Sequence, residues 1–139
     1  MLRRNFAVMG RQSVIAALVF YQHLFTLDPS LRGLFHTSIE LQGRKLMEAL
    51  EFTIATLENP AELVPMLEAM GRRHVSYGTR DEHYVTVKQA MLQTLRETLG
   101  FEFTPASEAA WGTALGFICD SMIRGAVDVQ PLLRGKASN

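Results

Sequence analysis

The sequence has a single cysteine and no excess of charge of either sign among its 139 residues. Cys119 cannot form an intramolecular disulfide, and its apolar neighbours favour a small core side chain. The 14 basic residues balance the 14 acidic ones, so the charge predicts neither a nucleic-acid partner nor an acidic-membrane partner. The cysteine usage fits a reducing compartment, and we expect a cytoplasmic protein.

Long hydrophobic runs are missing as well. The apolar stretch at 14–21 is too short to span a bilayer and no cleavage-like site follows it, so we expect no signal peptide. There is no internal repeat, no glycine-rich dinucleotide turn and no room for flavin and nicotinamide domains. We expect a single domain over 1–139, with a frayed tail at 129–139.

Sustained strand alternation is absent, whereas apolar residues recur at helical spacing, as at Leu46, Leu50 and Ile54. The fold class is therefore predicted to be all-α. The share of hydrophobic residues, 47% against 20% charged, fits a core that also houses a large apolar group. The expected helices cover residues 2–9, 12–27, 29–35, 38–57, 60–76, 80–99 and 105–127.

Turn and capping residues separate these helices. Asp, Asn or Thr before proline supplies a capping oxygen, and two Thr-x-x-Glu segments have the capping-box spacing. Glycine just after a helix suits a left-handed cap. The predicted N-caps are Asp28, Thr37, Asn59, Thr79 and Thr104, and the predicted C-caps are Gly78 and Gly100.

His74 lies on an apolar helical stripe with Leu63, Leu67 and Met70, which turns its imidazole toward the core. A buried histidine that hydrogen-bonds a carbonyl would give this pattern. So would a ligand of a metal or of haem iron, because one neutral imidazole suffices there.

If His74 binds a flat cofactor, three residues can form the wall on the opposite face of that cofactor. Gln42 and Leu46 lie one turn apart on a helix, and Tyr21 lies in the apolar run 14–27, where a buried hydroxyl needs a partner. The two polar residues also have simpler interpretations, since Gln42 can be solvated and the Tyr21 hydroxyl can bond a backbone carbonyl. We expect His23 and His83 at the surface.

The order and spacing of these features resemble the bacterial single-domain globins, relatives of neuroglobin-like proteins and of the globin half of flavohaemoglobins. The resemblance extends over nearly the whole chain. The segments that carry it are 20–35, 41–47, 71–78, 83–84 and 110–111.

The resemblance implies a globin fold packed around a haem pocket, with haem b as cofactor and His74 as the proximal iron ligand. It also implies that Phe35 packs on the porphyrin and that Tyr21, Gln42 and Leu46 form the distal pocket. The apolar lining would include Leu34, Met70, Val75, Val87 and Met122. Arg44, Lys45, His36 and Tyr77 can meet the propionates, although Arg44 and Lys45 equally suit a solvated helix face.

Two departures from the family pattern stand out. The first helix is shortened at its amino end. In flavohaemoglobin relatives a tyrosine and a glutamate polarise the proximal histidine. Tyr84 has the expected spacing from His74, but Ala126 stands where the glutamate should be. A strongly anionic proximal histidine is therefore not expected.

Three functions fit the sequence. The first is reversible O2 binding, in which hydrogen bonds from Tyr21 and Gln42 slow release; NO and CO also fit such a pocket. The second is NO dioxygenation with electrons from a separate reductase, since none is encoded here. The third is a gas sensor or a haem-free interaction module. The sequence leaves the oligomeric state open.

Overall fold

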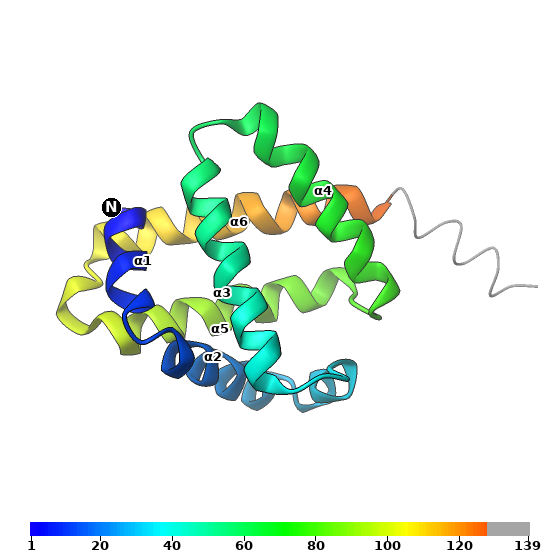
Figure 1. Cartoon of the computed structure of the whole chain (residues 1–139), viewed down its shortest axis with the longest axis horizontal. Helices are drawn as coiled ribbons and strands as arrows, with labels where there is room; N and C mark the ends of the chain where they lie inside the picture. Colours follow the sequence, from blue (N-terminus) through cyan, green and yellow to red (C-terminus); the bar gives the residue numbers. More distant parts are fainter. Residues whose placement is uncertain (128–139) are drawn as a thin grey trace, which may run out of the picture.

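The computed structural model describes residues 1–127, and within this range the chain forms helices and turns but no strand (Figure 1). The predicted tail at 129–139 lies outside the described residues. In chain order the elements are α1 (Leu2–Gly10), α2 (Ser13–Leu27), the 3-10 helix η1 (Pro29–Leu34), α3 (Ile39–Thr56), α4 (Pro60–Ser76), α5 (Asp81–Leu99), the 3-10 helix η2 (Gly100–Glu102) and α6 (Pro105–Val127).

The main core lies where α2, α3, α5 and α6 meet. In Figure 1, α3 crosses α5 and α6, which run side by side, and α4 slants across the same face. No residue of α4 belongs to the main core. Leu63 and Leu67 of α4 instead form a second cluster with Tyr84 of α5 and Met122 of α6, the α4–α6 cluster. Leu57 and Ile118 pack against both clusters.

The first helix is nine residues long and is tied to the last one. The indole Nε1 of Trp111 on α6 donates a hydrogen bond to the Asn5 side-chain oxygen at 3.2 Å, and both residues are buried. An indole N–H inside a core needs such an acceptor. This bond holds α1 against α6.

Several predicted helix ends are confirmed. Asp28 accepts the Ser30 backbone N–H at 3.1 Å, and Thr104 accepts that of Ser107 at 3.1 Å. Gly78 and Gly100 have φ values of 92° and 55°, in the left-handed region that favours glycine.

Both capping-box predictions are wrong by one residue. Ser38, and not Thr37, accepts the N–H of the first turn of α3. Arg80, and not Thr79, precedes α5, and its backbone N–H donates to the His83 Nδ1 at 3.0 Å. Spacing alone does not select which of two adjacent residues has the extended backbone that a cap requires.

None of the described helices is long and apolar enough to cross a membrane. Cys119 is half-buried on α6, and its Sγ lies 3.8 Å from the Tyr84 carbonyl oxygen. Burial raises the pKa of the thiol to about 11. The side chain is therefore a neutral packing group, in agreement with the sequence.

Candidate functional site

The orientation of His74 is set by its own helix. The ring is half-buried in the last turn of α4, and its Nδ1 lies 2.7 Å from the Met70 carbonyl oxygen. A carbonyl only accepts, so Nδ1 carries the proton and Nε2 keeps its lone pair. Burial lowers the pKa of His74 from its usual 6.5, which favours the neutral ring. His74 thus presents a neutral nitrogen donor.

The chain turns sharply just after His74. The Thr79 N–H donates to the His74 carbonyl at 3.1 Å and the Gly78 N–H donates to the Val75 carbonyl at 3.1 Å. These two bonds form a Schellman motif with glycine at its left-handed position. A side chain at Gly78 would also approach Leu34 of η1 to 3.1 Å. The end of α4 therefore packs closely on η1.

Tyr77 flanks the histidine at this end. Its ring centroid lies 5.4 Å from that of His74 at an interplanar angle of 63°, and the residue is 55% exposed. The Tyr77 hydroxyl can reach solvent, while its ring packs against one side of the His74 imidazole. This position suits the predicted polar edge.

Tyr21 of α2 is buried in an aromatic group. The ring centroids of Phe20, Phe35 and Phe25 lie 5.1, 5.4 and 5.9 Å from that of Tyr21. Burial raises the pKa of Tyr21 to about 12, so its hydroxyl stays protonated at neutral pH and can donate a hydrogen bond. Phe35 follows η1 and is half-buried.

Gln42 is half-buried in the first turns of α3. Its side-chain amide donates to the Thr37 hydroxyl just before the helix. One turn on, Leu46 packs on the main core. The structure therefore brings Leu46 to the core on which Tyr21 lies, while Gln42 is bonded to Thr37, which the sequence indicates only as a helix cap. Nothing in the sequence pattern singles out Thr37 as that partner.

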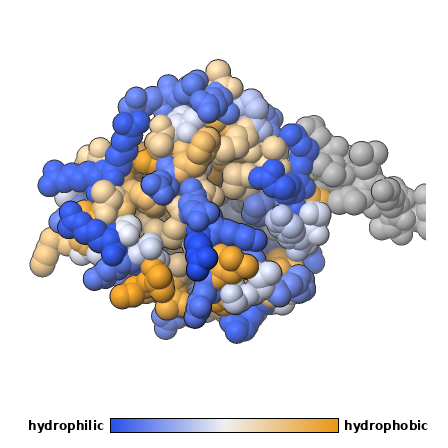
Figure 2. Space-filling view, in the orientation of Figure 1, coloured by the Kyte–Doolittle hydropathy of each residue, from blue (hydrophilic) through white to orange (hydrophobic). Residues whose placement is uncertain are grey.

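The predicted apolar lining comes from two separate clusters. Leu34, Phe35, Leu46 and Val87 pack on the main core that contains Tyr21, whereas Met70 and Met122 belong to the α4–α6 cluster. Val75 is half-buried beside His74. Figure 2 shows hydrophobic surface between the hydrophilic side chains on the face where α3 and α4 lie.

Tyr84 is buried near the start of α5, in the same cluster as Leu67, and its Oη has no hydrogen-bond partner among the described residues. Burial raises its pKa to about 12. Ala126, where the family resemblance would place a glutamate, is also buried and offers no carboxylate. A buried hydroxyl needs a hydrogen-bond partner, and none of residues 1–127 supplies one.

The polar residues predicted at the edge are spread out. His36, Arg44 and Lys45 are exposed. Arg44 lines a groove of about 630 Å³ between α1, α2 and α3, together with residues such as Phe6. The propionate contacts thus stay predictions.

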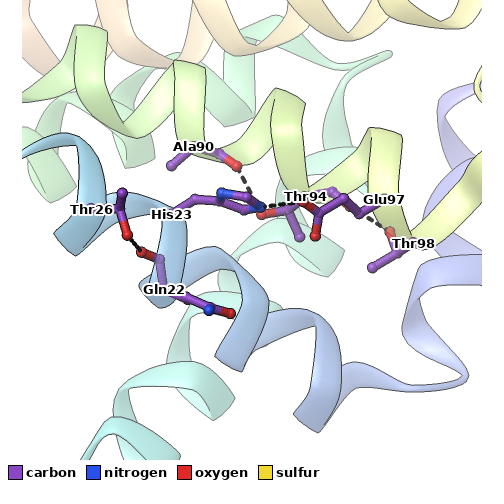
Figure 3. A network of polar contacts seen from close by, with 7 residues as sticks. All are labelled: Gln22, His23, Thr26, Ala90, Thr94, Glu97 and Thr98. Carbon is purple, nitrogen blue, oxygen red and sulfur yellow. Dashed lines mark hydrogen bonds and ion pairs between the residues drawn. The ribbon is translucent and has the colours of Figure 1, made fainter.

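His23 is half-buried, with 23% of its side chain exposed, where the sequence predicts a surface position. Figure 3 shows it between α2 and α5, where its Nε2 lies 2.9 Å from a Glu97 carboxylate oxygen. The two groups form an ion pair when His23 is protonated, but the geometry at Nε2 is not that of a hydrogen bond. Thr94, beside it on α5, donates to the Ala90 carbonyl at 2.8 Å. The His23–Glu97 contact joins α2, the helix of Tyr21, to α5. His83 is half-buried as well, because it caps α5.

Comparison with known proteins matches residues 18–122 to the globin family. Flavohaemoproteins of Bordetella parapertussis and Vibrio cholerae are each 33% identical over 75% of this chain. The chain spans only 27% of the length of each. An engineered carbene transferase from Rhodothermus marinus, provisionally named a nitric oxide dioxygenase, superposes with a TM-score of 0.85 at 26% identity, covering 96% of this chain and 93% of that one. A globin of Campylobacter jejuni, at 20% identity, gives a TM-score of 0.80 over 94% of both chains. The chain belongs to the globin family.

Proposed function

We propose that this chain binds haem b through His74 and reversibly binds O2 on the opposite side, where Tyr21 donates a hydrogen bond. The observation that carries the proposal is the hydrogen bond from the His74 Nδ1 to the Met70 carbonyl. It leaves the Nε2 of a half-buried, neutral imidazole available as a ligand, and this is how metal-bound histidines are usually oriented.

The surrounding residues fit such a cofactor. Met70 of the α4–α6 cluster and Phe35, Leu46 and Val87 of the main core would pack against its ring system. Haem, once bound, would supply an iron that can bind a diatomic gas. His74 would hold the iron, and the protonated Tyr21 would donate to the gas.

A haemin titration tests this proposal. Wild-type protein should take up one haemin per chain and show a Soret band that shifts reversibly with O2 after reduction. His74→Ala should lose tight retention. His23→Gln is a matched control, because His23 lies between α2 and α5 and pairs with Glu97. A colourless wild type, or equal retention by His74→Ala, would refute the proposal and favour a haem-free interaction module.

NO dioxygenation is the second candidate, with a separate reductase as electron donor. It is favoured by the flavohaemoprotein relatives and by the name of the Rhodothermus marinus protein. Steady NO consumption should then require an added reductase and continue for many turnovers. If oxygenated protein consumes only one NO per haem even with reductase present, O2 carriage is the better conclusion.

A further inference from the structure

Helices α4 and α6 cross in unusually close contact at two glycines. A Cβ atom added to Gly71 would lie 2.6 Å from the Met122 carbonyl carbon and closer still to its oxygen. A Cβ added to Gly125 would lie 2.5 Å from the Glu68 carbonyl carbon, again with the oxygen closer. Each glycine thus faces the carbonyl three residues before the glycine of the other helix. Because the obstacle is backbone, no side-chain rotation can relieve it.

This crossing is the main attachment of α4. Helix α4 packs along α6 over much of its length and contacts α3 far less, and its buried residues are absent from the main core. The position of α4 relative to the main core, which contains Tyr21, is therefore set mostly by how closely α4 lies on α6. Figure 1 shows the two helices crossing apart from α2.

His74 follows Gly71 by three residues in the same helix, less than one turn away. We propose that Gly71 and Gly125 are positioning residues that set how far the His74 imidazole reaches toward the iron; this rests on the proposed function. Ordinary contact with the two carbonyl oxygens would require the helices to separate by about 1.5 Å. Ligand distances in metal sites tolerate only about 0.2 Å. The rigid end of α4 would carry His74 away with it.

Gly125→Ala tests this from a residue remote in sequence from His74. Gly112→Ala is the matched control, since it lies on the same helix and an added Cβ there meets nothing within 4 Å. With haem bound, Gly125→Ala should shift the iron–histidine stretching band and speed haem loss by about 10- to 100-fold, as when the supports of metal ligands are removed. Gly112→Ala should leave both unchanged. Gly71→Ala should behave like Gly125→Ala. If either variant is unstable, it can be studied in the Gly112→Ala background, because alanine stabilises a helix interior relative to glycine.

Free imidazole separates positioning from general loosening. In a His74→Gly background with added imidazole, the ligand is no longer attached to α4, so Gly125→Ala should have almost no effect on the iron–imidazole band. An effect of equal size there would overturn the inference, as would wild-type behaviour of Gly125→Ala with His74 present. Both results require a wild type that binds haemin, whereas a wild type that binds none refutes the proposed function itself.

Discussion

Replacing Tyr21 with phenylalanine removes one hydroxyl and little else. The ring is held by Phe20, Phe25 and Phe35 with centroids 5.1 to 5.9 Å away, and these contacts do not use the oxygen. Phenylalanine therefore keeps the position of the ring. Because burial raises the pKa of Tyr21 to about 12, the hydroxyl is a hydrogen-bond donor over the whole neutral range. The substitution thus isolates that donor.

The expected consequence is faster O2 release. A hydrogen bond to a group with charge contributes about 1.5 to 3 kcal/mol, and about 1.4 kcal/mol corresponds to tenfold in rate. Losing it should therefore speed dissociation roughly 10- to 100-fold. Gln42→Ala should have a smaller effect, because the Gln42 amide already donates to Thr37 and must give up that bond to reach the gas. Stopped-flow mixing of oxygenated protein with excess CO measures both rates.

Tyr77→Phe is the matched control. It removes a tyrosine hydroxyl on the His74 side of the site, where the side chain is largely exposed. Its O2 release should match that of the wild type. If Tyr21→Phe and Gln42→Ala also release O2 at the wild-type rate, neither residue donates to the gas and the assignment of this wall is wrong.

Three further outcomes are expected. Asn5→Ala should lower the free energy of unfolding by about 1 to 3 kcal/mol in urea denaturation, because the buried Trp111 N–H loses its acceptor. Tyr84→Phe should leave the stability of haem-free protein unchanged or raise it by up to about 1 kcal/mol, since the Tyr84 Oη has no described partner; a large loss would reveal one. Burial lowers the pKa of His74 below its unfolded value of 6.5, so the unfolded chain takes up the proton first as pH falls. The melting temperature of haem-free protein should accordingly fall below about pH 6.5, and less steeply in His74→Leu; equal slopes would contradict this.

The helices could be predicted from the sequence because their signals are local. A hydroxyl or carboxylate before proline and a glycine after an apolar run act within a few residues, and Asp28, Thr104 and Gly78 behave as expected. The caps at Thr37 and Thr79 were predicted wrongly for the same local reason. Adjacent residues compete for the capping position, and the backbone angles that decide the competition are not visible in residue spacing.

The site was predictable only in part. The apolar stripe predicts an inward face for His74, where the structure has a half-buried ring, and its carbonyl partner, Met70, lies one turn earlier, as helix geometry allows. The bond between Gln42 and Thr37 depends on a rotamer, and that between His23 and Glu97 joins two helices. Period and composition carry no information about such pairs.

The division of the apolar residues into two clusters connects the fold to the proposed cofactor. A chain whose only task was to fold would gain by packing α4 into the main core, since buried apolar surface is its main source of stability. Instead α4 packs on α6, and half-buried apolar side chains such as Leu46 and Met70 lie on different clusters. A flat apolar ligand that contacts both would bury surface that the protein alone leaves half-exposed. Its binding would stabilise the folded state by mass action. Such a ligand would thus join α4, which is otherwise held mainly by α6, to the main core.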